Sequence, residues 1–287
     1  MRFPVRWFVL GCLALHSQAI QAQASPDTAP TTLNEAIPFQ LGSGFLIVVE
    51  GSIGALTPLK FILDTGASHT VVDRKIADKL SLPRQKGKVL NFDRYAKVQW
   101  TNLAELQLGP LDARDVHVMV SDLKQFSEFA EGVDAIVGLD LLRTSQSLWI
   151  DYGKRLVAFK TLVAYVPVNS ENVPALIVRL PVQGQTMHLI VDTGLQGMLL
   201  YADRLRGHMP QLKLTDKIAE AHEGRLSGEK VKLAGIILGP HELQASVLLL
   251  RGAPHSLPYD IDGYCGTGLL NAQLIELDFA SNTIRWQ

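Results

Sequence analysis

Cysteine is almost missing from this sequence. Among 287 residues there are two cysteines, Cys12 and Cys265, and Cys12 lies in an N-terminal apolar segment that we expect to be removed. A mature chain with one thiol has no internal disulfide, so its stability must come from packing. We interpret Cys265 as a small core residue, because no histidine in the sequence is placed to activate it as a nucleophile.

An excess of charge of one sign is also missing. The chain has 27 Lys and Arg against 28 Asp and Glu, which gives a formal net charge of -1. Nucleic-acid-binding proteins carry clustered positive charge, so we expect no nucleic-acid partner. Because 47% of the residues are apolar, the chain can build a sizeable core and is a folded protein.

Several catalytic motifs are missing as well. The eight histidines are scattered without an H-E-x-x-H motif, no G-x-S-x-G occurs, and "LGSGF" (41–45) lacks the spacing of a dinucleotide-binding loop. A zinc hydrolase, a serine hydrolase and a dinucleotide enzyme are therefore disfavoured. We expect no metal and no organic cofactor, and we interpret His69 as a surface or turn residue.

The N-terminus has the pattern of a secretory signal peptide. Two arginines precede the apolar run "WFVLGCLAL" (7–15), and an Ala-Gln-Ala sequence ends at Ala24. The apolar run is too short to span a bilayer, so we expect cleavage after Ala24 and no stable membrane insertion afterwards. Lipoprotein anchoring at Cys12 fits less well because it truncates the apolar segment. The mature protein would be periplasmic or secreted, with a flexible lead over 25–32.

The remaining chain repeats itself. The triplet Asp-Thr-Gly occurs after an apolar run in "FILDTGAS" and again in "LIVDTGLQ", and other segments recur in the same order. These pairs are 106–120 with 236–250, 134–142 with 262–270, and 149–159 with 276–286. Such a duplication predicts two similar lobes, which we place at 33–160 and 173–287 with a linker over 161–172.

Within each lobe short apolar runs are broken by Gly, Pro, Asn and Asp, which is typical of strands and hairpins. Helix patterns are few; we expect them at 71–80, at 121–130, just after Gly138 and at 201–209. The sequence therefore predicts an all-β protein with minor helices.

The repeated acids, Asp64 and Asp192, each end a strongly apolar strand. If the lobes are related by an approximate two-fold axis, the two carboxylates meet across it. Two close carboxylates cannot both ionise easily, so one acts as a base and the other as an acid. That pair suits the attack of water on an amide. Gly66 and Gly194 allow tight turns beside the acids, and Thr65 and Thr193 offer hydroxyls that can bond between facing loops.

These motifs resemble those of the aspartic proteases, nearer the retropepsin-like type than the pepsins. The resemblance rests on the two Asp-Thr-Gly segments, each followed later by two apolar residues and Gly: Ile136-Val137-Gly138 and Tyr264-Cys265-Gly266. It implies two retropepsin-like β-barrel lobes in a pseudo-two-fold arrangement. It also implies that the Thr65 and Thr193 hydroxyls interlock beneath a catalytic pair, Asp64 and Asp192.

Two departures from the pepsins concern the position after each triplet. Ala67 and Leu195 stand where pepsins usually have Ser or Thr. Without that hydrogen bond the ionised form is less favoured, so we expect raised pKa values and a mildly acidic to near-neutral optimum.

By analogy with the family, hairpins over 87–100 and 223–233 would cover the substrate, the second with its tip at Ser227-Gly228. An extended peptide could pair with their edges. Tyr95 and Trp100 are candidate substrate-binding residues, and each could equally pack on its own lobe.

The sequence thus predicts a monomeric aspartic endopeptidase of the cell envelope that cuts polypeptides. Two alternatives stay open: a noncatalytic peptide-binding or scaffold protein with a retained protease fold, and pairing of lobes between chains.

Overall fold

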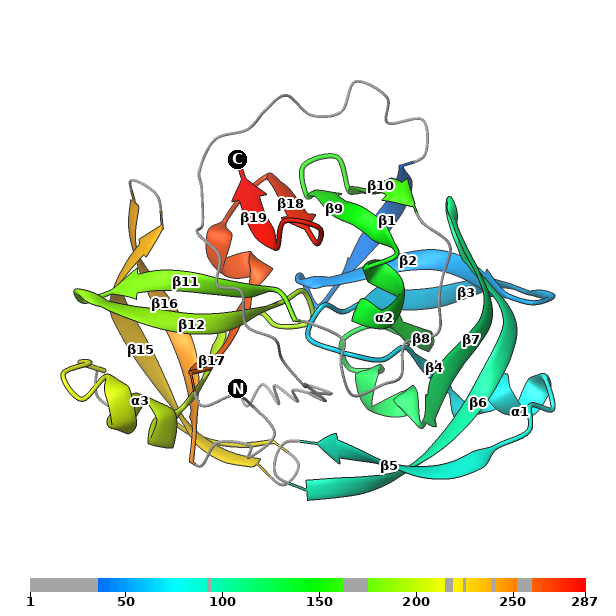
Figure 1. Cartoon of the computed structure of the whole chain (residues 1–287), viewed down its shortest axis with the longest axis horizontal. Coiled ribbons are helices and arrows are strands. Elements are labelled where there is room, and N and C mark those ends of the chain that lie inside the picture. Colours follow the sequence, from blue (N-terminus) through cyan, green and yellow to red (C-terminus); the bar gives the residue numbers. More distant parts are fainter. Residues whose placement is uncertain are drawn as a thin grey trace.

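The computed structural model of the chain describes residues 36–91, 94–162, 175–214, 219–223, 226–238, 241–251 and 260–287 (Figure 1). The predicted signal peptide, the predicted lead and residues 163–172 of the predicted linker lie outside these residues. The lobe boundaries stay predictions. Among the described residues, no helix combines the length and the apolar character needed to cross a bilayer.

Strands dominate both halves of the chain. Those of the first half are β1 (Ile37–Gly42), β2 (Leu46–Ile53), β3 (Leu56–Leu63), β4 (Val71–Asp73), β5 (Gln85–Asn91), β6 (Arg94–Leu108), β7 (Leu111–Ser121), β8 (Val133–Val137), β9 (Ser145–Asp151) and β10 (Leu156–Leu162). Those of the second half are β11 (Ile177–Val182), β12 (Gln185–Asp192), β13 (Met198–Tyr201), β14 (Ala219–Glu223), β15 (Leu226–Leu238), β16 (His241–Leu250), β17 (Gly263–Gly266), β18 (Leu274–Asp278) and β19 (Thr283–Trp286).

Helices are short; four of the five in the described residues lie within the predicted segments, and the last was not predicted. They are α1 (Arg74–Lys79), the 3₁₀ turn η1 (Leu123–Phe126), α2 (Leu139–Leu142) and α3 (Ala202–His208), and a further 3₁₀ turn is η2 (Thr267–Leu270). Helix α1 begins later than predicted because Val71 and Val72 form a buried strand between β7 and β8. Asp73 then caps the helix by accepting a hydrogen bond from the Lys75 N–H.

The two halves have the same strand topology. In the first, strands β2, β3, β8, β4, β7 and β6 are neighbours in that order, and β6 pairs back to β2. In the second, β11, β12, β17, β13, β16 and β15 follow the same order, and β15 pairs back to β11. Each half is thus a closed barrel, with a hairpin strand, β5 or β14, beyond the closing strand. The structure explains the sequence repeat as two copies of one fold.

The register is also repeated. In the first half β3 runs parallel to β8 with Leu63 opposite Val137, and in the second β12 runs parallel to β17 with Val191 opposite Cys265. A strand in such a position is covered on both faces, so consecutive rather than alternate side chains are apolar. This is why Phe61, Ile62 and Leu63 are all buried.

A shared sheet joins the halves. The C-terminal strands β18 and β19 extend the first half's sheet through the pairing of β18 with β9, and they lie between the two barrels in Figure 1. Leu148 and Ile150 of β9 face Leu277 and Ile275 of β18, and all four are fully buried. The barrels are therefore fixed to each other by backbone hydrogen bonds and by a common core.

Candidate active site

Asp64 and Asp192 lie next to each other where the two barrels meet. Asp64 directly follows β3 and Asp192 ends β12, so equivalent strands bring each acid to the junction. Their side chains are 5% and 3% exposed, and the carboxyl groups are close enough for a hydrogen bond between them. The structure thus brings together two acids that are 128 residues apart in the sequence.

Backbone N–H groups fix the orientation of both carboxylates. The N–H groups of Gly66 and Ala67 donate to Asp64 Oδ1 over 2.8 and 3.1 Å. The Gly194 N–H donates to Asp192 Oδ1 over 2.7 Å. Each acid is therefore held by the turn that its own Asp-Thr-Gly triplet forms.

Both carboxyl groups have a raised pKa. Burial raises the pKa of Asp64 to about 6, against the lowering effect of its hydrogen bonds with Asp192, Gly66 and Ala67. Burial, and then the charge of Asp64, raise the pKa of Asp192 well above its usual range. Two adjacent buried carboxylates resist double ionisation, so the pair holds one proton over a wide pH interval.

Thr65 and Thr193 interlock beneath the carboxylates. The Thr65 hydroxyl donates to the Val191 carbonyl over 2.9 Å and accepts from the Thr193 N–H over 3.1 Å. In return the Thr193 hydroxyl donates to the Leu63 carbonyl over 2.7 Å and accepts from the Thr65 N–H over 3.0 Å. Both threonines are buried, so three polar groups of each loop are satisfied by these four hydrogen bonds to the opposite loop.

The glycines after the threonines leave room for the opposite acid. A Cβ atom at Gly66 would lie 2.4 Å from the Asp192 carboxyl carbon, and one at Gly194 would lie 3.1 Å from the Asp64 carboxyl carbon. The first distance is impossible for a real Cβ contact. Gly66 is thus needed for the close approach of the two carboxyl groups.

Asp140, which sequence reasoning missed, supports the Asp64 loop. Its carboxylate accepts from the Thr70 N–H and hydroxyl over 2.9 and 2.7 Å, and the same hydroxyl accepts from the Gly138 N–H over 3.1 Å. Burial raises the pKa of Asp140 to about 6. The signal that could have found it is the acid two residues after Ile136-Val137-Gly138.

The second half lacks this support. Met198 and Gly268 stand where the first half has Thr70 and Asp140. There the loop is held by backbone instead: the Gly266 N–H donates to the Gly197 carbonyl over 2.7 Å. The two halves of the site therefore match in backbone and differ in side-chain support.

Cys265 lies beside the pair as a buried core residue. It is 7% exposed and stands opposite Val191 on the neighbouring strand. Burial, with a smaller effect of Asp192, raises the pKa of its thiol to about 12. The thiol stays protonated at ordinary pH and is a poor nucleophile.

His69 was interpreted as a surface or turn residue: it does lie in a bend of the loop after Asp64, but the surface interpretation is wrong. His69 is 7% exposed, its Nδ1 is 2.8 Å from the Ser68 hydroxyl, and its ring meets the Trp100 ring edge-on at 5.3 Å. The ring is buried because the Asp64 loop carries it under the β5–β6 hairpin. The prediction used the polarity of the residues next to His69, which carries no information about a hairpin that covers the side chain from elsewhere in the sequence.

Of the two candidate substrate-binding residues, Trp100 and Tyr95, the structure describes the side chain of Trp100. Trp100 on β6 is 8% exposed, stacks on His117 with ring centroids 4.8 Å apart, and is contacted by Gly87 of β5. It packs on its own lobe, and its role toward substrate stays a prediction. The side chain of Tyr95 lies outside what the structure describes.

Both predicted hairpins are present. Strand β5 pairs with β6 up to Asn91 opposite Arg94, and β14 pairs with β15 up to Glu223 opposite Leu226. Ser227 stands opposite His222 of β14 within this pairing, so the predicted tip at Ser227-Gly228 is wrong. Gly228 instead lies within β15, where it pairs with both β14 and β16.

Within the described residues, no group of three or more His, Cys, Asp or Glu side chains is arranged to hold a metal ion.

Residues 49–144 match the family model described as gag-polyprotein putative aspartyl protease. This segment, 96 of the 287 residues, resembles the retropepsin-like aspartyl proteases. It contains Asp64, Thr65, Gly66 and Gly138, and the repeated topology extends the retropepsin-like fold to the second barrel. The predicted resemblance and the predicted fold class are confirmed. The comparison with curated proteins found no match.

The family is described as putative aspartyl proteases, so the match supports hydrolase chemistry of that general class. It covers only the first retropepsin-like barrel. Asp192, Thr193 and Gly194 lie beyond it, and their place in the site rests on the geometry described above.

Proposed function

We propose that the chain is an aspartic endopeptidase in which Asp64 and Asp192 together activate one water molecule. The observation that carries the proposal is the meeting of two buried carboxyl groups, one from each barrel, with raised pKa values. Such a pair contains a base and an acid at the same pH. Peptide hydrolysis needs both at one point.

The proposed reaction uses one ionised and one protonated carboxyl group. The ionised carboxylate accepts a proton from the water, whose oxygen attacks the carbonyl carbon of the peptide, while the protonated carboxyl donates to the carbonyl oxygen. The resulting tetrahedral diol returns one hydroxyl proton to the ionised member of the pair, and it loses its amine as the nitrogen receives a proton from the protonated member. The products are a carboxylic acid and an amine, and the pair again holds one proton.

The remaining residues position these two groups. The N–H groups of Gly66 and Gly194 orient the carboxylates, and the hydroxyls of Thr65 and Thr193 fix one loop against the other. Fixed geometry contributes to rate because reacting atoms need no further ordering. The hairpins β5–β6 and β14–β15 offer strand edges to an extended polypeptide substrate.

We also propose where the protein acts and in which oligomeric state. We infer export by the segment at 1–24, action on polypeptides in the periplasm or outside the cell, and a monomer that carries both halves of its site. Loss of the signal segment would leave a protein of residues 25–287.

The test is a cleavage assay with a diverse peptide library and residues 25–287. The wild type should cut internal peptide bonds, whereas the Asp64→Asn/Asp192→Asn variant should cut none. Mass spectrometry identifies the products. Specific binding of peptides by the wild type without any cleavage would favour the noncatalytic alternative and reject the protease.

The pH profile of the wild type provides a second test. Activity needs one proton on the pair, so it should rise as the first carboxyl ionises, near the Asp64 pKa of about 6, and fall when the shared proton is lost. We expect a mildly acidic to near-neutral optimum. A peak at about pH 2 to 3, the range of a carboxyl pair with lowered pKa values, would contradict it.

A further inference from the structure

A basic groove lies beside the β5–β6 hairpin, on the side of α1. Its volume is about 840 Å³, and five of its lining residues are cationic: Arg74, Arg84, Lys86, Lys88 and Lys97. Its other lining residues, Gly87, Val98, Gln99, Val120 and Ser121, include no acid. The whole chain has a formal net charge of -1, so positive charge is concentrated in this groove.

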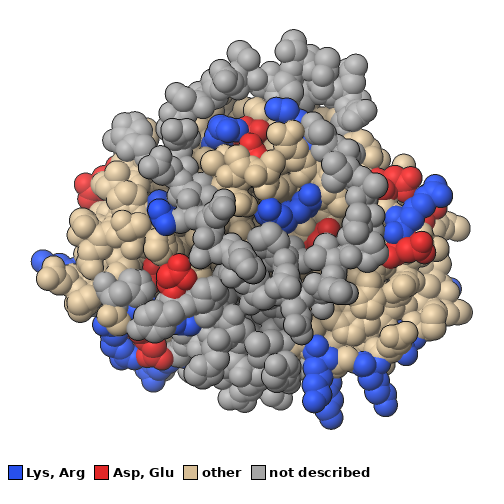
Figure 2. Space-filling view, viewed as in Figure 1, with Lys and Arg blue, Asp and Glu red and all other residues tan. Residues whose placement is uncertain are grey.

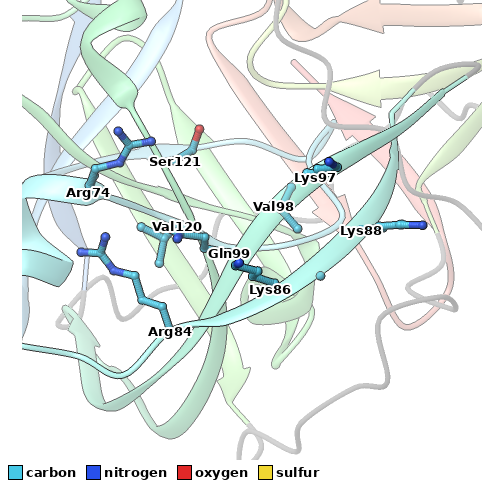
Figure 3. Close-up of a pocket in the computed structure, with 10 residues that line it drawn as sticks. Arg74, Arg84, Lys86, Lys88, Lys97, Val98, Gln99, Val120 and Ser121 are labelled. Atoms are coloured by element: carbon cyan, nitrogen blue, oxygen red, sulfur yellow. The ribbon is translucent and has the colours of Figure 1, made fainter.

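The cations come from separate elements and spread along the groove. Figure 3 shows Arg74 and Arg84 at one end, and Lys88 and Lys97 toward the other. In the space-filling view, Lys and Arg side chains project below the region where β5 lies (Figure 2). A ligand in this groove would therefore meet positive charge along its length.

Four of the five cations have no anionic partner in the described parts of the chain. Arg84 forms an ion pair with Asp78. Arg74, Lys86, Lys88 and Lys97 form none among the described residues. They remain available to an external anion.

The strand register makes this arrangement unfavourable in the free protein. Lys88 of β5 stands directly opposite Lys97 of β6, and Lys86 stands opposite Gln99. Like charges at directly opposed positions of an antiparallel pair destabilise it. Lysines on an edge strand also prevent aggregation. That role could explain Lys86 and Lys88, but not Lys97 on the inner strand or Arg74 on α1.

We propose that this groove is a docking site for an extended acidic segment of the polypeptide substrate, which rests on the proposed protease function. Strand β5 is the last strand of its sheet, so an extended peptide can pair with its outer edge. Alternate side chains of such a peptide lie on the face that carries Lys86 and Lys88. Acidic residues at every second position would match both lysines.

The docking site is separate from the carboxyl pair, although the β5–β6 hairpin that carries it also contacts the Asp64 loop. Gly87, between the two lysines, packs against Trp100, and the Trp100 ring contacts His69 of the Asp64 loop. The lysines point to the opposite face of the β5 strand from this contact. The acidic segment would therefore lie outside the stretch that is cut and would lower KM with little effect on kcat.

Binding can be measured without turnover on the full mature chain carrying Asp64→Asn. The probe is a short labelled peptide with Glu at alternate positions, and the matched probe has Gln at those positions. We expect the Glu peptide to bind at least about fivefold more tightly at low salt, a ratio typical of one or two partly screened charge pairs. Fluorescence anisotropy gives both affinities.

Lys86→Gln/Lys88→Gln, which removes both lysines that face the alternate acids of the peptide, should abolish this preference. Lys160→Gln/Lys213→Gln removes the same charge from exposed positions on β10 and after α3, and it should keep the preference. Lys88→Glu should also abolish the preference while raising the urea midpoint, because an opposite-charge pair replaces a like-charge pair. A merely structural role of Lys88 would lower the midpoint instead.

Equal binding of the Glu and Gln peptides, or equal loss in both double variants, would overturn the proposal. So would tighter binding of a single-stranded oligonucleotide, inorganic phosphate or phosphatidylglycerol vesicles through Lys86 and Lys88. These results do not depend on cleavage: a wild type that cuts no peptide rejects the protease and leaves the measured acidic-peptide preference standing.

Discussion

At the scale of single residues, the site depends on contacts that tolerate no added atom. Gly66 faces the Asp192 carboxyl group, and Gly194 faces the Asp64 carboxyl group, but the available space differs: a Cβ would lie 2.4 Å away in the first case and 3.1 Å in the second. The same chemical change should therefore have different effects in the two halves.

We predict that Gly66→Ala lowers kcat far more than Gly194→Ala. The new methyl group at position 66 must displace the Asp192 carboxyl group, and a misplacement of about 1 Å can cost about a hundredfold in rate. At position 194 a shift of a few tenths of an ångström suffices. Steady-state kinetics on one peptide checks the order, with circular dichroism as the control for folding. Equal losses would contradict the account of Gly66.

The buried acid Asp140 gives a prediction about stability. Its pKa is raised from 3.8 to about 6 in the folded protein, so folding favours its protonated form. The stabilisation is complete below the unfolded pKa and is lost as the pH rises through the folded pKa. Between about pH 4 and 6 this residue should reduce the free energy of unfolding by about 3 kcal/mol.

Urea denaturation at several pH values tests this prediction. The wild type should lose more stability between pH 4 and pH 6 than Asp140→Asn, which cannot ionise. The difference between the two slopes isolates Asp140 from the other titrating groups. Parallel curves for the two proteins would show that Asp140 ionises as easily in the folded protein as in the unfolded one.

At the scale of structural elements, the Asp-Thr-Gly loops stabilise each other through the two threonine hydroxyls. We predict that Thr65→Val and Thr193→Val each lower the free energy of unfolding by about 1–3 kcal/mol, because each leaves a buried N–H and a buried carbonyl of the opposite loop without a partner. Thr→Ser at either position keeps the hydroxyl and should retain most of the stability. Urea midpoints check both pairs of variants, and a Ser variant as unstable as the Val variant would contradict it.

Much of this element-level description was predictable from the sequence. The Asp-Thr-Gly triplets, the apolar strands before them and the apolar-apolar-Gly segments are local patterns whose meaning does not depend on distant residues. Three features were not predictable: the burial of His69, the role of Asp140 and the tip of the second hairpin. His69 is covered by a hairpin that begins sixteen residues later in the sequence, and Asp140 acts on Thr70, which is seventy residues away.

The alternation of apolar and polar residues in the sequence could not locate the tip of the second hairpin. Gly228 suggested a turn because glycine is common there. In the structure a Cβ at Gly228 would lie 2.7 Å from the Leu249 carbonyl, so the glycine permits a close approach of β15 to its neighbour. The same residue type serves both purposes, and only the tertiary pairing distinguishes them.

At the scale of the whole molecule, the two barrels depend on each other. The β9–β18 ladder and the interlocked threonines cross the junction, and Arg143 donates to the Phe279 carbonyl over 2.9 Å. The sequence repeat predicted two lobes. It did not reveal that β18 and β19 join the sheet of the first half, because strand pairing between lobes leaves no local pattern.

We predict that residues 36–162, expressed alone, will self-associate. Without β18 the β9 edge is unpaired and the buried side chains Leu148 and Ile150 lose part of their cover, which favours pairing with a second copy. Size-exclusion chromatography with light scattering measures the mass of this fragment and of residues 25–287, which should be a monomer. A stable monomeric fragment would contradict the interdependence of the halves.

The most direct test of the central claim compares kcat/KM for Asp64→Asn and Asp192→Asn on a peptide that the wild type cuts, with Asp112→Asn, an exposed acid, as the matched control. If the two carboxyl groups share one proton and act together, each single variant should lose at least about a thousandfold, and the double variant should lose little more. The Asp112→Asn variant should equal the wild type. Near-normal turnover in either single variant would contradict a site assembled from both barrels.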